Sequence, residues 1–247
     1  MTEPLHIGRA LFAPRGLVML AAAWIFCSWI SIFGFRPPAQ PQAASYSPSV
    51  HLLFIMLAVG VSIAWPLLRL SGRPSRSPML QACFDGLALF VLLQVVIWPL
   101  RLVTNWTLAR AIAVDASLAA SVLTTAAVVA AVHGRASPRA RTAAMAVAVL
   151  LTAAPSIAVA AGLADGVRIV APGGGARGAL MNALIALSGP TLVAQFTTPV
   201  PLDPVPAENA VIFKAFALAT TLWAVVLAMR LFRPLTVASD ERFDPPT

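Results

Sequence analysis

The stretch that decides the fold is LADGVRIVAPGGGARGALMNALIALSGPTLVAQFTTPVPLDPVPAEN, residues 163–209. It lies between two clear apolar runs and has three parts: a glycine-rich run, an apolar segment over residues 178–196, and a proline-rich acidic end. If the apolar segment crosses a membrane, everything after it lies on the other side. If the segment enters and returns, everything after it stays on the same side.

The composition predicts a polytopic helical membrane protein. Of the 247 residues, 59% are hydrophobic and only 11% are charged, and the mean hydropathy is +0.85. A soluble domain carries about 25% charged residues, so this chain has too few polar groups to cover a water-facing surface. Apolar runs of about 20 residues recur along it, which is the length of a helical membrane span. The predicted fold is therefore all-α, in one integral membrane domain over residues 1–247.

Six apolar runs are expected to cross the membrane. They lie near residues 17–35, 50–68, 84–102, 111–132, 142–162 and 210–231. An amphipathic segment over residues 5–15 is expected to lie in the membrane interface before the first of them. Pro66 predicts a kink in the second span, which neighbouring groups can tolerate by satisfying the freed carbonyl.

Basic residues concentrate in alternate loops, which predicts the orientation. With both termini in the cytoplasm, 11 of the 17 Lys and Arg residues are cytoplasmic and five are external, as the positive-inside rule requires. The cytoplasmic residues are Arg9, Arg15, Arg69, Arg73, Arg76, Arg135, Arg139, Arg141, Arg230, Arg233 and Arg242. The external residues are Arg36, Arg101, Arg110, Arg168 and Arg177. The arginine- and alanine-rich composition is typical of GC-rich bacteria, so we expect a bacterial inner (cytoplasmic) membrane.

Two cytoplasmic termini need an even number of crossings. Residues 178–196 are therefore predicted to enter from the external side and return to it. Asn182, Ser188-Gly189-Pro190 and Gln195 interrupt this segment, and Ser-Gly-Pro is typical of a turn. The alternative is seven transmembrane helices, with residues 178–196 as a full span.

The sequence carries no recognisable catalytic or cofactor motif. The glycine run PGGGARG, residues 172–178, lacks the Gly-Lys-Ser/Thr of a phosphate-binding loop. The histidines fall at span ends, whereas a haem needs histidines deep in facing spans; they are His6, His51 and His133. The net charge of +8 sits at span ends, so nucleic acid is not an expected partner. We expect no enzyme activity, no cofactor and no metal in this chain.

Polar groups inside apolar runs are the remaining candidates. Three amide side chains either line a substrate path or hydrogen-bond between helices: Gln94, Asn182 and Gln195. The intramembrane charges, Lys214 and Asp85, lie close enough to span ends to snorkel or cap. The two cysteines have no partner spacing and are expected to be small buried hydrophobes; they are Cys27 and Cys83.

The ordered pattern is an interfacial segment, two spans, a basic loop, two spans, a second basic loop, a fifth span, a re-entrant hairpin and a sixth span. Over the whole chain, in topology and length, this pattern resembles the permease subunit of type-2 ABC exporters. The resemblance implies that residues 5–15 contact a separate ATPase. It also implies a coupling loop over residues 69–84, with Arg73, Arg76 and Asp85 as contacts. This loop lacks the acidic residues that are common in the coupling segments of the family.

Two functions follow as hypotheses. The first is a permease subunit that pairs with a second copy and with an ATPase to export a lipidic or amphipathic substrate, since the chain offers little intramembrane charge for an ion. The second is a non-catalytic structural subunit of a larger respiratory or photosynthetic membrane complex. The alanine-rich fourth and fifth spans favour the second hypothesis, because small residues permit close helix contact.

Overall fold

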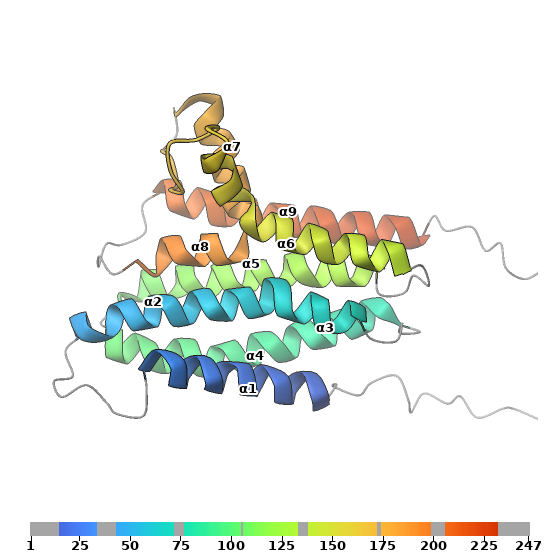
Figure 1. Cartoon of the computed structure of the whole chain (residues 1–247), viewed down its shortest axis with the longest axis horizontal. Coiled ribbons are helices and arrows are strands. Elements are labelled where there is room, and N and C mark those ends of the chain that lie inside the picture. Colours follow the sequence, from blue (N-terminus) through green and yellow to red (C-terminus); the bar gives the residue numbers. More distant parts are fainter. Residues whose placement is uncertain are drawn as a thin grey trace, which may run out of the picture.

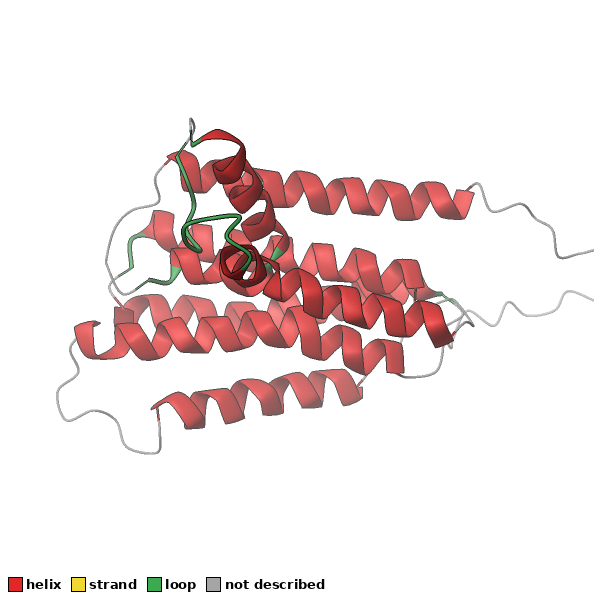
Figure 2. Ribbon diagram, turned by 45° about the horizontal axis from the view of Figure 1, so that its top comes forward, coloured by secondary structure: helices red, strands yellow, loops and turns green. Residues whose placement is uncertain are grey.

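The protein is a bundle of long helices, most of which run along one axis (Figure 1). The computed structural model describes residues 15–33, 43–71, 77–104, 106–132, 138–171, 174–198 and 206–231, and every regular element in these ranges is helical. The elements are α1 (Arg15–Phe33), α2 (Ala43–Val59), η2 (Gly60–Ala64), α3 (Trp65–Ser71), α4 (Pro78–Thr104), α5 (Leu108–Val132), α6 (Pro138–Ala160), α7 (Gly175–Leu187), α8 (Gly189–Phe196) and α9 (Pro206–Leu231). The predicted all-α fold is confirmed, and Figure 2 shows helices joined only by loops.

Five helical runs are long and apolar enough to cross a membrane. They are Tyr46–Ser71, Pro78–Leu102, Leu108–Val132, Pro138–Ala160 and Glu208–Leu231. A shorter apolar helix, Gly16–Ile30, lies beside them at the edge of the bundle (Figure 1). The chain is therefore a polytopic helical membrane protein. The six runs expected to be spans each overlap one of these helices, whereas residues 5–14 of the expected interfacial segment lie outside the described residues.

The second span is irregular where Pro66 predicts a kink. Pro66 has no N–H to donate to the carbonyl of Ser62, four residues earlier. The five residues of η2 form a π-helical turn directly before it, and the Trp65 N–H donates to the carbonyl of Gly60. Such turns absorb a local change in hydrogen bonding without breaking the helix. Helices α2, η2 and α3 therefore form one continuous membrane span, whose hydrogen-bond pattern changes at the π-helical turn.

The direction of each helix follows from contacts at the two ends of the bundle. Helix α9 runs parallel to α5, because Trp223 donates to the carbonyl of Leu123 and Arg230 to that of Ala130. Helix α6 begins where α3 ends, since Arg141 donates to the carbonyl of Leu70. We call the end where α2, α5 and α9 begin the hairpin end. The opposite end, where α1 begins and α9 finishes, is the termini end (Figure 1).

Helices α7 and α8 enter the bundle and return. They meet at an angle of 103° across a single residue, Ser188. Helix α8 finishes at the hairpin end, where Thr197 contacts His51 near the start of α2 and Phe196 contacts Arg110 near the start of α5. Helix α6 also finishes at that end, so the pair makes no net crossing. The re-entrant interpretation of residues 178–196 therefore agrees with the structure.

Helix α5 forms the centre of the bundle. Its small residues are buried along most of its length, as at Ala113, Ser117 and Ala120, which lets α4 and α9 approach closely. The expectation that both cysteines are buried was wrong: Cys27 and Cys83 are exposed on the surface of the bundle. In a membrane that surface faces lipid, where a thiol behaves as a small apolar group.

Cysteine labelling tests this path of the chain. In a Cys27→Ala, Cys83→Ala background, single cysteines replace Ala161 after α6, Thr198 after α8 and Ser77 before α4. Because α7 and α8 make no net crossing, we expect an impermeant maleimide to label the Ala161 and Thr198 sites from the same side. We expect the Ser77 site to react only from the opposite side. Labelling of the Ala161 and Thr198 sites from opposite sides would show a seventh crossing.

Candidate functional site

The break between α7 and α8 is held by hydrogen bonds at the centre of the bundle. Ser188 is fully buried and has an extended backbone, with φ −95° and ψ 98°. Its hydroxyl donates to the carbonyl of Thr152 on α6 at 2.8 Å and lies 2.8 Å from the Thr191 hydroxyl. Pro190 occupies the first turn of α8, where a missing N–H costs nothing. The turn predicted at Ser188-Gly189-Pro190 is present, and α6 fixes its position.

Gly189 allows the tip of the hairpin to touch two other spans. A Cβ at this position would lie 2.6 Å from the Ser62 hydroxyl in η2 and 2.7 Å from the Ser121 hydroxyl in α5. Real Cβ atoms do not approach other heavy atoms this closely. Glycine is therefore required at position 189, because the Ser62 and Ser121 hydroxyls leave no room for a side chain. The hairpin tip packs directly against the π-helical turn.

A small cavity with both apolar and hydroxyl groups in its lining lies beside the hairpin tip. Its volume is about 30 Å³, which is enough to hold a water molecule. The hydroxyls of Ser62, Thr124 and Thr125 line it, and none of the three has a hydrogen-bond partner among the described residues.

The outer end of the hairpin is anchored by Arg110 on α5. This side chain is 3% exposed, and its Nε donates to the carbonyl of Phe196 at 2.9 Å. A second guanidinium nitrogen donates to the carbonyl of Thr198. The positive charge therefore meets the last carbonyls of α8, where the helix dipole is negative. The ring of Trp106, 5.5 Å from Arg110 Cζ, covers the same guanidinium.

Two of the predicted substrate-path residues bind the loop before α7. The Asn182 side chain accepts from the Val170 N–H at 2.9 Å and donates to the Val170 carbonyl at 2.8 Å. Gln195 donates to the carbonyl of Val167 at 3.1 Å. These amides satisfy the backbone of a non-helical segment. Their role in a substrate path stays a prediction.

The third predicted path residue, Gln94, lies on a different face of the bundle. Its Nε2 donates to Oδ1 of Asp115 on α5 at 2.6 Å, and Trp98 donates its indole N–H to Gln94 Oε1 at 2.8 Å. The structure therefore does not bring Gln94 together with Asn182 and Gln195. It places Gln94 instead in a polar cluster with Asp115 and Trp98.

The predicted docking residue Asp85 is fully buried at the termini end. Arg69 Nε lies 2.5 Å from Asp85 Oδ2, and Gln81 donates to Asp85 Oδ1 at 2.8 Å. This pair ties the end of α3 to the start of α4 across the loop that joins them. Arg73 and Arg76 lie in that loop and fall outside the described residues. Docking by the three residues stays a prediction.

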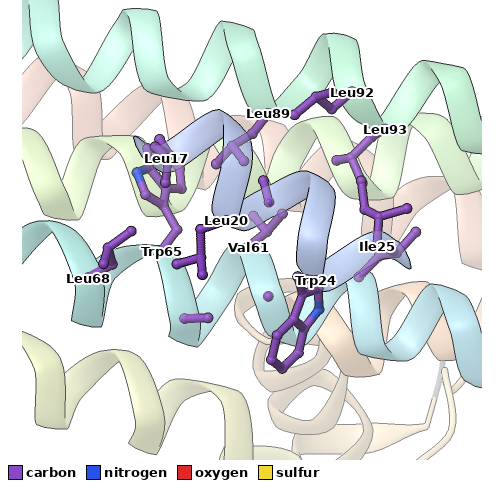
Figure 3. A pocket seen from close by; sticks show the side chains of 14 residues that line it. Leu17, Leu20, Trp24, Ile25, Val61, Trp65, Leu68, Leu89, Leu92 and Leu93 are labelled. Carbon is purple, nitrogen blue, oxygen red and sulfur yellow. The ribbon is translucent and has the colours of Figure 1, made fainter. Parts of the chain in front are cut away.

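An apolar cavity of about 240 Å³ lies between α1 and the helices α2, η2 and α4 (Figure 3). Leu20 and Trp24 of α1 face Val61 and Trp65 across it, and Leu89 and Leu93 of α4 close its far side. Trp24 donates its indole N–H to the carbonyl of Met56, which fixes the ring at the mouth. The cavity suits an apolar chain better than a polar molecule, because its lining offers almost no hydrogen-bonding groups.

Comparison with known proteins does not place the chain in a family. No family model, no curated protein and no solved structure matches it. The chemistry of the described residues is therefore the guide to function. Within those residues, no three His, Cys, Asp or Glu side chains gather where a metal ion could bind.

Sequence reasoning overlooked several residues that hold the hairpin. Arg110 was counted as an external loop charge, yet it is buried in the first turn of α5. The signal that could have found it is its position only one turn from Asp115, inside a continuous apolar run. Ser62 and Ser121 gave no signal, because serines inside alanine-rich helices are common and only the fold brings these two to Gly189.

Replacing Gly189 by alanine tests the close contact at the hairpin tip. The added Cβ would overlap the Ser62 and Ser121 hydroxyls, so we expect Gly189→Ala to destabilise the protein by about 1–3 kcal/mol. Thermal unfolding of the purified protein in detergent measures the effect. A matched control is Gly166→Ala, because a Cβ there meets nothing within 4 Å.

Removing the two hydroxyls provides the second arm of this test. In a Gly189→Ala background, Ser62→Ala and Ser121→Ala together should restore part of the lost stability, because they remove the two nearest atoms and leave the Ser121 Cβ at 2.9 Å. If Gly189→Ala is as stable as Gly166→Ala, the hairpin tip does not pack as described.

Proposed function

We propose that this chain is the membrane-spanning permease subunit of an ABC-type exporter, working with a separate ATPase and a second copy to move a lipidic or amphipathic substrate. The re-entrant pair carries the proposal. Helices α7 and α8 enter from one end of the bundle of apolar helices, while α1 begins and α9 finishes at the other end. This arrangement suits a transporter in which an inserted hairpin closes one end of the substrate path and an ATPase pushes on the other end of the bundle.

The termini end is suited to receive that force. The buried pair of Arg69 and Asp85 joins α3 to α4 rigidly on either side of their connecting loop. Breaking a buried ion pair leaves an uncompensated charge and is strongly unfavourable. A push on this loop by an ATPase would therefore move both spans together. We place this end in the cytoplasm of a bacterial inner membrane, because basic residues gather there.

The hairpin end is suited to act as the external gate. Its position depends on Arg110 at the outer end of α8 and on Ser188 and Gly189 at the tip. Gly189 touches η2, which continues directly into α3 and so to the Arg69–Asp85 pair. A displacement of α3 is transmitted to the hairpin tip through this one continuous span.

The character of the substrate follows from the cavity in Figure 3. At about 240 Å³ it is slightly smaller than typical ligand pockets, and its lining is almost entirely apolar. It accepts an acyl or isoprenoid chain, and an ion would find no polar group to replace its water there. Substrate exit between α1 and η2 would pass Trp24, which contacts Gly60.

Purification from the cells in which the chain is native tests the proposal. We expect the tagged chain, extracted in mild detergent, to bring with it a vanadate-sensitive ATP hydrolysis that amphipathic lipids stimulate. Ala64→Phe fills the cavity and should reduce this stimulation several-fold. Ala143→Phe is the matched control, because Ala143 is exposed on α6 away from the cavity lining.

The opposite result favours the second candidate function. If no ATP hydrolysis accompanies the folded chain and redox or pigment proteins accompany it instead, the export proposal fails. The close packing of small residues around α5 would then be explained by a structural subunit of a larger membrane complex. Equal stimulation in the Ala64→Phe and Ala143→Phe variants would separately exclude the apolar cavity as the substrate site.

A further inference from the structure

A polar cluster lies on the outward face of the bundle, where α4 and α5 meet. It consists of Asp115, Gln94 and Trp98, joined by hydrogen bonds of 2.6 and 2.8 Å. Its neighbours on the same two helices are exposed apolar side chains that face lipid in a membrane: Val91, Val95 and Ile112. The cluster therefore belongs to the lipid-facing surface rather than to the core or the hairpin.

The cluster lies at membrane depth. Asp115 follows the first residue of α5 by seven positions, which is about 10 Å along the helix. Gln94 precedes Leu102, the end of its apolar run, by eight positions. Both helices are longer than the roughly 20 residues needed to cross the hydrocarbon, so part of each helix extends beyond it. The part of α5 that extends beyond the hydrocarbon is too short to place Asp115 at the interface.

One oxygen of the carboxylate is available for a ligand. Gln94 donates to Oδ1, and no described residue donates to Oδ2. Asp115 is only partly buried, so its side chain is accessible from the surface of the bundle. A carboxylate that faces hydrocarbon is costly and is usually matched by a partner. A cation is the partner that best balances the charge, because an anion would be repelled and an acyl chain would leave the carboxylate unsolvated.

A groove continues from the cluster along the same face. It has a volume of about 340 Å³, an almost entirely apolar lining and a half-open shape. Phe90 lies one turn from Gln94, and Ala119 lies one turn from Asp115, so the groove begins about one helical turn from the carboxylate. It extends between α4 and α9 as far as Ala126, about 16 Å from Asp115 along α5. Trp223 of α9 closes one side.

We propose that this face binds an amphipathic cation, with its ammonium group on Asp115 and its apolar chain in the groove toward the termini end. Gln94 and Trp98 hold the carboxylate in place, and the Trp98 ring adds the attraction of an aromatic face for a cation. The site is separate from the cavity of Figure 3, because different residues of α4 line the two. It goes beyond the proposed export function, because it requires neither an ATPase nor a second copy.

Photo-crosslinking to the whole chain tests the proposal. The probe is a dodecyltrimethylammonium ion that carries a diazirine on its chain, added to the protein in nanodiscs of phosphatidylglycerol, a lipid without a cationic headgroup. We expect saturable labelling of α4 and α5 residues along the groove. Asp115→Asn, which keeps the shape and removes the charge, should weaken binding by about tenfold to hundredfold. Dodecyl sulfate should not compete.

Two matched variants separate the charge from the fold. Asp165→Asn removes an exposed carboxylate in the loop after α6 and should leave binding unchanged. Ala119→Phe keeps the carboxylate but blocks the start of the groove, and it should also prevent labelling. Equal binding by the wild type and a folded Asp115→Asn variant overturns the proposal, as does the absence of labelling in the wild type.

A further experiment distinguishes a lipid headgroup from a free cation as the ligand. Competition by phosphatidylethanolamine in the nanodisc points to a lipid headgroup, and competition only by free amphiphiles points to a free cation. If instead Asp115→Asn converts a dimer to a monomer and no probe binds, a second copy of the chain covers the carboxylate and the cation proposal is wrong.

Discussion

The fold depends on how the chain satisfies a backbone that turns inside the membrane. A helix can cross hydrocarbon because its hydrogen bonds are internal, but a break exposes N–H and C=O groups that lipid cannot satisfy. In this protein the break at Ser188 is surrounded by α6, α5 and η2, and the serine hydroxyl bonds the Thr152 carbonyl. At the outer end, Arg110 supplies donors to the last carbonyls of α8. Without these groups the hairpin would be driven either to span or to leave the membrane.

Helix α5 organises this arrangement, because residues on its successive turns serve different parts of the hairpin. Arg110 binds the end of α8, and Ser121, three turns deeper, contacts Gly189 at the tip. The hydroxyls of Ser117 and Ser121 bond carbonyls of their own helix, so they add no unpaired polar group to the core. Small side chains on the remaining faces of α5 let α4 and α9 pack closely against it. One helix thus sets both the depth of the hairpin and the close packing of its neighbours.

The sequence predicted the helices better than the contacts between them. Apolar runs reveal spans because membrane thickness fixes their length, and Ser188-Gly189-Pro190 revealed the turn because that tripeptide favours a break in a helix. Burial could not be predicted in the same way: in a helix that is apolar on every side, nothing distinguishes the face toward lipid from the face toward protein. That is why Cys27 and Cys83 were expected to be buried and are exposed. Arg110 was missed because charge alone suggested a loop.

Two kinds of polar group can be compared in the described bundle, and the comparison separates support from candidate function. Asn182, Gln195, Ser188 and Arg110 all bond backbone groups in or beside the hairpin, so each is explained by the turn it supports. Asp115 supports no backbone. Its carboxylate is bonded by another side chain, stands beside a groove and retains an oxygen without a described partner. The bond to Gln94 joins α4 to α5 through one carboxylate oxygen, and the second oxygen of this charge at membrane depth is the part that suits a site for another molecule.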